Sequence, residues 1–150
     1  MRLITKKLCS DPWIYDIPLS YNPCPNNSFT GYFMYNNKLA AIARVYTTKE
    51  SNTAELSDIY VINELRGKIA PNNKKWSDNI MISILNAIQR RNIKKVWLWT
   101  TLDNISAIKL YEKFGFESQK FPNNKKKQLY EKYEWLKGKE LIYMTKIVIY

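Results

Sequence analysis

The stretch that decides the fold is Asn104-Ile-Ser-Ala-Ile-Lys-Leu-Tyr-Glu-Lys-Phe-Gly-Phe-Glu117. Its apolar residues recur at helical spacing, and Asp103 or Asn104 supplies a capping side chain at its start. Gly115 follows in the position where a glycine usually ends a helix. The stretch therefore predicts a helix over about residues 105–114. Asn104 and Tyr111 share one face of it because they are seven residues apart.

Strands are predicted on both sides of this helix. The apolar run in Lys95–Thr100 reads as a buried strand, and the chain is extended again from Phe116. Upstream, residues 78–91 place their apolar side chains on one face and end on two arginines. That pattern predicts another helix, with Ser77 as its N-cap. The order favours a β-α-β unit in the second half of the chain.

Antiparallel strands are predicted in the first half. Phe29–Tyr35 and Leu39–Thr47 are rich in aromatic and β-branched residues. Asn36-Asn37 separates them, and asparagine tolerates the positive φ of a tight hairpin turn. Glu55–Ile62 is a third strand of the same kind, and Arg2–Leu8 is a short strand at the start of the chain.

The remaining segments complete an α+β chain with a mixed sheet. A proline- and asparagine-rich passage over residues 12–27 breaks regular structure. Pro122–Lys127 is predicted to be a charged loop, and Leu129–Leu136 a short helix or an irregular cover. Leu141–Ile149 is an apolar final strand.

Length and composition restrict the class of protein. The 150 residues fit a single domain over residues 1–150. No apolar run approaches the roughly 20 residues of a spanning helix, and the N-terminus has no signal-peptide core. A protein without membrane association, in the cytoplasm, is therefore expected. The chain has no histidine and only two cysteines, which excludes Ser-His and Cys-His pairs and a structural zinc site. Any general base must be a carboxylate, tyrosine, lysine or water.

The net charge of +11 has two interpretations. It indicates a polyanionic partner, either nucleic acid or a ligand with several phosphates. Alternatively it reflects biased composition, which the abundance of Lys, Asn, Ile and Tyr favours. The excess charge is concentrated in Lys68–Lys75 and Lys120–Lys127. The chain has no known nucleic-acid-binding motif, so nucleic acid is not the expected partner.

One of these basic segments precedes a predicted helix. A loop that runs into a helix N-terminus presents free backbone N–H groups and a positive dipole, which bind phosphate. Here the loop also carries Arg66, Lys68, Lys74 and Lys75. Taken by itself, the loop is equally compatible with solvated lysines that hold no ligand.

The chain resembles the GCN5-related N-acetyltransferase (GNAT) superfamily. The resemblance is carried by the strand Ile59–Ile62, by Arg66-Gly67-Lys68, and by the pattern N-x-x-A-x-x-L-Y-x-x-x-G-F-E that begins at Asn104. It covers about residues 29–117 in order. It implies a mixed, mostly antiparallel sheet of six or seven strands, splayed between Glu55–Ile62 and Lys95–Thr100 and flanked by helices.

The resemblance also implies a reaction. Acetyl-CoA would serve as co-substrate, a primary amine would attack its thioester directly, and no metal would take part. Tyr111 would protonate the leaving thiolate, and Glu55 or Asp58 would be the candidate base. A further set of residues would bind the cofactor: Ile59, Tyr60, Val61, Arg66, Gly67, Lys68, Lys74, Lys75, Trp76, Ser77 and Asn104.

The loop departs from the family pattern, which continues with glycines after the arginine. Here Ile69-Ala70-Pro71 follows Lys68, and the loop is several residues longer. The acceptor amine, a polyamine-like small molecule or a peptide or protein amine, does not follow from the resemblance, and neither does the choice between a monomer and a homodimer. A catalytically silent CoA-binding or protein-interaction domain of the same fold is the alternative.

Overall fold

The computed structural model describes residues 1–7, 28–47 and 52–148. It divides into two compact units, Met1–Val96 with the end of the chain from Ile147, and Trp97–Lys146. The proline-rich passage, both cysteines and the last residue of the predicted final strand lie outside the described residues.

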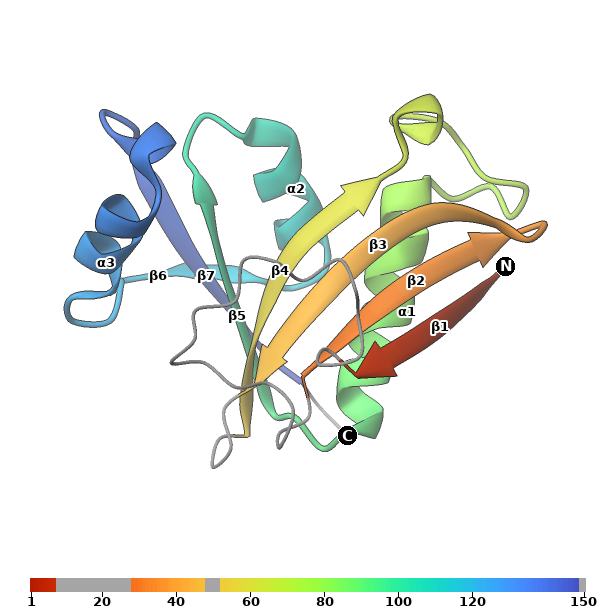
Figure 1. Cartoon of the computed structure of the whole chain (residues 1–150), viewed down its shortest axis with the longest axis horizontal. Helices are drawn as coiled ribbons and strands as arrows, with labels where there is room; N and C mark the ends of the chain where they lie inside the picture. The colour runs from red at the N-terminus through yellow and green to blue at the C-terminus, as the bar shows by residue number, and fades with distance from the viewer. Residues whose placement is uncertain (8–27, 48–51, 149–150) are drawn as a thin grey trace. The chain divides into compact units, whose positions relative to one another are not determined.

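The first unit is built on four antiparallel strands (Figure 1). In order across the sheet they are β1 (Arg2–Lys7), β2 (Phe29–Tyr35), β3 (Lys38–Thr47) and β4 (Thr53–Val61). The β2–β3 turn confirms the predicted hairpin, because Asn36 and Asn37 have φ of 50° and 61°.

Helix α1 (Trp76–Arg90) covers one face of these strands (Figure 1). Its buried side chains include Ile80, Ile84 and Ile88, each 0% exposed. The helix lies close to β2 at Gly31, where a Cβ atom would be 2.8 Å from Cδ1 of Ile84. A side chain at this position would have to displace the end of the Ile84 side chain, so the contact favours glycine.

The predicted N-cap of α1 is wrong by two residues. Lys75 is the N-cap, and Ser77 lies in the first turn. The helix begins earlier because Trp76 is buried, with its ring centroid 6.3 Å from that of Phe33 and 5.4 Å from that of Tyr35. Burial of this indole outweighs the capping preference of a serine.

Strand β4 contains a β-bulge. Arg44 is paired with Ser57 and Ile42 with Tyr60, so two residues of β4 lie opposite one residue of β3. Asp58 is one of the two, and its φ of 53° is in the left-handed region. The bulge breaks the regular alternation of side chains between Glu55 and Asp58.

The second unit holds most of β5 (Lys95–Thr101) and β7 (Leu141–Ile147), with the short β6 (Glu117–Gln119) beside β7. Helix α2 (Ile105–Lys113) follows β5 and confirms the predicted helix. With the four strands of the first unit, the described residues form seven strands of one mixed sheet and three helices, so the predicted α+β class is confirmed.

The connection from β6 to β7 differs from the prediction. Helix α3 (Lys125–Lys132) includes the lysines that were expected in a loop, and the 3-10 turn η3 (Glu134–Leu136) follows it. The predicted loop is wrong because Leu129, in the middle of this segment, packs with Leu136 and Leu141 in a small core. A helix is the conformation that directs Leu129 inward while its lysine neighbours face water.

Backbone with positive φ, the left-handed region, occurs at few residue types. Among the described residues other than glycine, every one with positive φ is an asparagine or Asp58. These asparagines occupy turns and helix ends, at positions 36, 37, 73, 92 and 124. The side chains of Asn and Asp tolerate this region better than those of other L-residues.

Candidate functional site

The end of β4 carries the residues expected to pair with the cofactor. Tyr60 is 44% exposed, and the Arg66 guanidinium lies 4.5 Å from the centroid of its ring. Arg66 Nε also donates a hydrogen bond to the Val61 carbonyl oxygen, over 2.9 Å. Arg66 therefore folds back onto the strand end, and the Val61 carbonyl already has a partner.

Gly67 owes its place to a turn. Arg66 has φ −61° and ψ 132°, Gly67 has φ 71°, and the Lys68 N–H bonds to the Leu65 carbonyl over 3.1 Å. These are the dihedral angles of a type II turn, which requires positive φ at its third residue and so favours glycine there. A Cβ atom on Gly67 would meet nothing within 4 Å. Conformation therefore explains this glycine, without any close approach of backbone to another group.

The residues that replace the family's later glycines form a small hairpin. Ile69 bridges to Lys75, and the Ala70 N–H bonds to the Lys74 carbonyl over 2.7 Å. The turn closes with the Asn73 N–H on the Ala70 carbonyl, at 3.0 Å. The loop thus satisfies much of its backbone internally, which distinguishes it from an open glycine-rich cradle.

Two amides attach this hairpin to α1. Asn72 Nδ2 donates to Asn79 Oδ1 over 2.7 Å, and Asn79 Nδ2 donates to Asn72 Oδ1 over 3.1 Å. Asn79 is buried in the first turn of the helix. The reciprocal pair fixes the hairpin at the helix N-terminus.

The helix N-terminus itself is partly satisfied. The Trp76 N–H bonds to the Lys68 carbonyl over 3.4 Å, so at least one donor at the start of the helix has a protein partner. The buried Asp78 adds a carboxylate to the same turn. Lys68, Lys74 and Lys75 are exposed, and none forms an ion pair with another described residue. These three ammonium groups are the part of this end that remains available to an anion.

The two candidate bases differ in their surroundings. Asp58 Oδ2 lies 3.3 Å from Arg44 Nη1, and the Asp58 side chain is 52% exposed. The bulge holds it there with left-handed backbone. Glu55 is half-buried in β4, opposite Tyr46 of β3.

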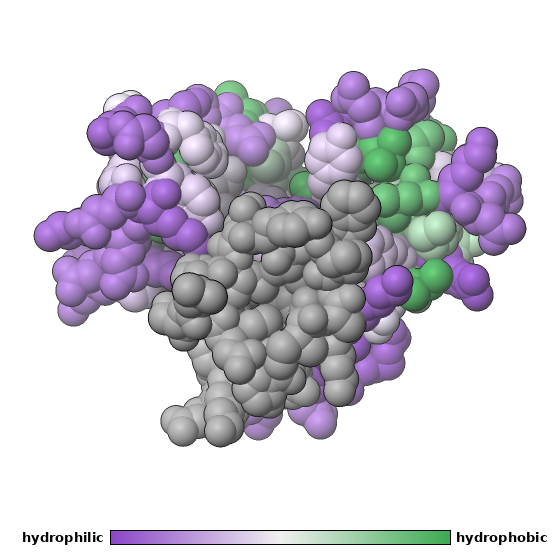
Figure 2. All heavy atoms as spheres, in the orientation of Figure 1, coloured by the Kyte–Doolittle hydropathy of each residue, from purple (hydrophilic) through white to green (hydrophobic). Residues whose placement is uncertain are grey.

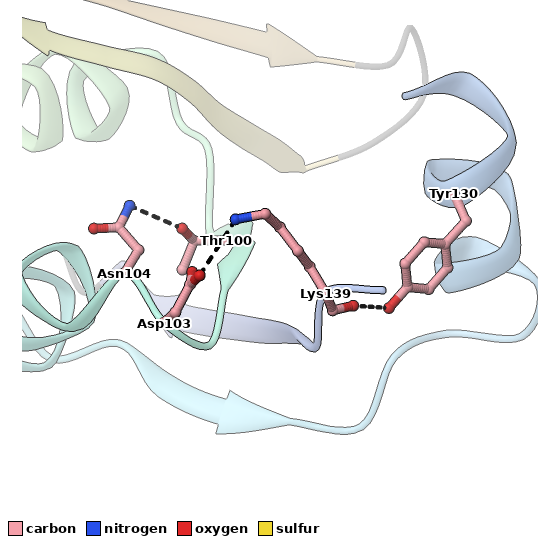
Figure 3. Close-up of polar contacts among 5 residues, drawn as sticks. All are labelled: Thr100, Asp103, Asn104, Tyr130 and Lys139. Atoms are coloured by element: carbon pink, nitrogen blue, oxygen red, sulfur yellow. Dashed lines mark hydrogen bonds and ion pairs between the residues drawn. The ribbon is translucent and has the colours of Figure 1, made fainter. Parts of the chain in front are cut away.

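In the second unit, Asn104 is the N-cap residue of α2, but its side chain does not cap the helix. Its Nδ2 donates to Thr100 Oγ1 over 3.3 Å (Figure 3). Beside it, Asp103 Oδ2 lies 3.3 Å from Lys139 Nζ. Hydrogen bonds from Thr101 and Lys139 lower the pKa of Asp103 below its ordinary value. This carboxylate therefore remains ionised and holds the segment before β7 against the start of α2.

The sequence did not reveal this junction. Lys139 lies in the segment before β7 and carried no pattern of its own, and its carbonyl accepts a hydrogen bond from the Tyr130 hydroxyl of α3 (Figure 3). The Leu102 N–H adds a bond to the Glu140 carbonyl over 2.8 Å. Only Asp103 gave a signal, as a possible cap.

Tyr111 lies in the last turn of α2, on the helix that begins beside Asn104. Its ring centroid is 5.9 Å from that of Phe116. The Gly115 N–H bonds to the Glu112 carbonyl and the Phe116 N–H to the Tyr111 carbonyl, each over 3.0 Å. With Gly115 at φ 89° this is a Schellman ending, whose hydrophobic contact is the Tyr111–Phe116 pair.

Burial raises the pKa of Tyr111 to about 12. The phenol is therefore protonated at neutral pH and is a hydrogen-bond donor. Desolvation is the cause, since an apolar environment disfavours the phenolate. Such a group can deliver a proton to a developing anion.

The predicted site residues fall into two sets, each within one unit. Arg66, Gly67, Lys68, Lys74, Lys75, Trp76 and Ser77 gather at the start of α1, next to the end of β4. Asn104 and Tyr111 share α2. The described residues contain no group of three or more acidic or cysteine side chains placed to hold a metal ion. Within the same residues, no helix is both long and apolar enough to cross a membrane.

Comparison with known protein families finds a match in the part of the chain that contains Asn104 and Tyr111. Residues 78–116, which include most of α1 and all of β5 and α2, match the family model described as Acetyltransferase (GNAT) family. No curated protein sequence matches the chain.

Solved structures share the fold. The ribosomal-protein-S18-alanine N-acetyltransferase of Escherichia coli is 21% identical, with a TM-score of 0.59, and the alignment covers 83% of this chain and 70% of that one. Spermidine N-acetyltransferase of Vibrio cholerae, solved with CoA and spermine, is 17% identical with a TM-score of 0.62, over 82% of this chain and 67% of that one.

A GNAT-family acetyltransferase of Streptococcus pneumoniae has a TM-score of 0.58 at 17% identity, over 82% of this chain and 68% of that one. At these identities the likeness concerns the fold. The resemblance of this chain to the GNAT superfamily is thus confirmed, by the family match in residues 78–116 and by the fold it shares with solved acetyltransferases.

Proposed function

We propose that the protein is an acetyl-CoA-dependent N-acetyltransferase that acts on a primary amine. The observation that carries the proposal is Tyr111, a half-buried and protonated phenol inside the segment that matches the family model. The acceptor would be a small molecule such as a polyamine, or an amine of a peptide or protein. The structural relatives include enzymes named for both kinds of acceptor.

In this proposal the chain's residues divide the work. Lys68, Lys74 and Lys75 attract the phosphates of the cofactor, and backbone groups of Trp76 and Ser77 lie next to them. The strand end at Ile59 and Tyr60 pairs with the pantetheine arm, with Arg66 in place over Tyr60. At Val61 the carbonyl is already taken by Arg66, so pairing there depends on other backbone groups.

The chemical step is a direct attack. The amine nitrogen, after losing a proton to Glu55, Asp58 or water, bonds to the thioester carbon. The carbon–sulfur bond breaks, and Tyr111 gives its hydroxyl proton to the departing thiolate. Asn104, beside Thr100 at the start of the same helix, contacts the cofactor or a water bound to it. We expect the enzyme to work in the cytoplasm, as a monomer or a homodimer.

Cofactor binding is the first test. CoA or acetyl-CoA at 100 times its Kd should stabilise the folded protein by about 2.7 kcal/mol, because it binds the native state selectively. For a chain of this length the melting temperature should rise by roughly 5–10 °C. Differential scanning fluorimetry at low salt measures this. An unchanged melting temperature at millimolar CoA would contradict the proposal.

The lysines of the hairpin give a second test. The Lys74→Ala/Lys75→Ala variant should bind CoA more weakly, with a shallower salt dependence, since it removes two exposed cations near the phosphates. Isothermal titration at several salt concentrations measures both effects. Lys126→Ala/Lys127→Ala removes the same charge in the second unit and serves as the matched control. If the two variants bound CoA with equal affinity, Lys74 and Lys75 would not hold the phosphates, and backbone amides would have to bind them instead.

A catalytically silent CoA-binding or protein-interaction domain is the second candidate. The Lys68 carbonyl on the Trp76 N–H favours it, because this bond satisfies a donor that a phosphate would otherwise use. Acetyl-CoA turnover with a panel of amines separates the two candidates. CoA binding without turnover of any amine would favour the silent domain.

A further inference from the structure

The segment that joins β6 to β7 is much longer than a connection between two adjacent strands needs to be. These two strands are adjacent and antiparallel, with Glu117 opposite Thr145 and Gln119 opposite Tyr143. Hairpin connections of two to five residues usually join such strands. Here residues 120–140 intervene and build α3 and η3. Long connections of this kind often carry a binding function.

The β6–β7 connection, residues 120–140, packs firmly against the rest of its unit. Leu129 and Leu136 are buried with Leu141, and the Tyr130 hydroxyl bonds to the Lys139 carbonyl (Figure 3). Tyr133 contacts Trp99, with ring centroids 5.7 Å apart. A surface held in this way has little conformational entropy to lose when a partner binds.

The β6–β7 connection is also strongly basic, with seven lysines against three glutamates. Hydrophilic side chains crowd the surface over α3 (Figure 2). Lys137 and Lys139 are paired with acidic residues, but Lys120, Lys126 and Lys127 form no ion pair within the described chain. Unpaired lysines on a fixed helix create a local positive potential that complements a polyanion.

Aromatic rings accompany these lysines. Trp135 in η3 is 61% exposed, and its ring centroid lies 6.3 Å from that of Tyr133. Lys132 Nζ is 5.1 Å from the Tyr133 ring, and Lys125 Nζ is 4.5 Å from the Trp97 ring. Trp135 is thus the ring of this group with the most surface open to a partner.

We infer that the α3–η3 surface binds single-stranded nucleic acid, with Trp135 stacking on a base and Lys126 and Lys127 contacting phosphates. Exposed rings beside unpaired lysines are the combination that single strands use, because every base offers a face for stacking. An acidic peptide would engage the lysines but would leave the indole without a matching group. The sequence shows the basic segment Lys120–Lys127 but no nucleic-acid-binding motif, and the exposure of Trp135 is known only from the structure. The inference does not depend on acetyl transfer.

Binding of a fluorescently labelled single-stranded DNA or RNA 12-mer, followed by anisotropy at 50 mM salt, tests the inference. We expect Trp135→Ala to weaken binding about tenfold, which is within the usual range for loss of one stacked base. Lys126→Ala/Lys127→Ala should weaken binding and reduce the slope of log K against log salt by about 1.4, or ~0.7 for each phosphate that the variant no longer neutralises.

Two variants with matched changes elsewhere provide the controls. Lys74→Ala/Lys75→Ala removes the same charge in the first unit, and Tyr60→Ala removes another exposed ring that a cation covers. Both should bind the oligonucleotide like the parent protein, and all variants should keep a cooperative melt. The inference would be overturned if the single strand did not bind at 50 mM salt, or if the two lysine-pair variants lost affinity equally. It would also be overturned if a duplex of the same sequence, or polyglutamate, bound as tightly as the single strand.

Discussion

Tyr111→Phe should lower kcat for acetyl transfer by about 100-fold while leaving KM for acetyl-CoA nearly unchanged. The substitution removes the proton that the phenol delivers to the departing thiolate, an interaction made mainly in the transition state. The ring and its contact with Phe116 remain, so the Schellman ending of α2 should persist. Steady-state kinetics with saturating amine measure the effect. A folded variant with undiminished kcat would remove Tyr111 from the mechanism.

Tyr130→Phe is the matched control, because it removes a hydroxyl from the same unit without touching the proposed chemistry. The variant cannot form the hydrogen bond to Lys139, so a small loss of stability with a normal kcat is expected. The pH dependence gives a further check. With its pKa raised to about 12, Tyr111 should remain a proton donor throughout the range in which ordinary tyrosines ionise near pH 10.

The same shift has a consequence for stability. The unfolded chain gives up this proton near the ordinary pKa of 10.0 and the folded chain only near 12. The contribution of Tyr111 to the free energy of unfolding is therefore complete below pH 10. It is lost as the pH rises from 10 to about 12, because the unfolded chain releases the proton first. Tyr111→Phe should lack this part of the alkaline loss, which denaturant melts at pH 9 and pH 11 would reveal.

Ile84→Ala should cost about 2–5 kcal/mol of unfolding free energy, the usual range for a fully buried aliphatic side chain. Ile84 is 0% exposed and lies where α1 approaches Gly31. Each kcal/mol should lower the melting temperature by roughly 2–4 °C in a chain of this length. Urea denaturation measures the loss directly. Leu102→Ala, at a position 52% exposed, is the control that should change little.

Gly31 makes this prediction sharper. In the parent protein Gly31→Ala should destabilise by about 1–3 kcal/mol, because the new methyl group would lie 2.8 Å from Ile84 Cδ1. In the Ile84→Ala background the nearest obstructing atom is absent, although Leu3 Cδ1 remains at 3.1 Å, so the same substitution should cost less. A double-mutant cycle measures this coupling. Purely additive losses would show that α1 does not depend on the missing side chain at Gly31.

Local patterns predicted most of the elements because each pattern reflects an interaction close in sequence. The hairpin at Asn36-Asn37 and the ending of α2 at Gly115 follow from φ preferences of single residues, and both are confirmed. The start of α1 did not follow from Ser77, because burial of Trp76 against Phe33 is a contact between residues distant in the chain. Helix α3 was likewise missed at its start, since its lysines hid a single buried leucine.

For the candidate site, the sequence identified residue types better than it identified their partners. Tyr111 and Asn104 were proposed through the resemblance of their segment to the GNAT pattern, but the bonds that hold Lys139 to Asp103 and Tyr130 come from a remote segment. The reciprocal Asn72–Asn79 pair was equally invisible, because an asparagine in a loop has no periodicity. How the cofactor would be held by the lysines of the hairpin stays a prediction.

The distribution of left-handed residues helps to explain why the loop before α1 departs from the GNAT pattern that the chain resembles. The protein has only four glycines, and at five positions of the described residues it uses asparagine where the backbone has positive φ. Asparagine can replace glycine where conformation is the requirement, but it always brings a Cβ atom and an amide. It cannot replace a glycine whose purpose is empty space. A lineage that loses glycines can therefore keep every bend of its fold and still lose the bare backbone that a phosphate would approach. The Asn72–Asn79 pair shows the other side of this exchange, since the added amides can bind each other and give the loop a shape of its own.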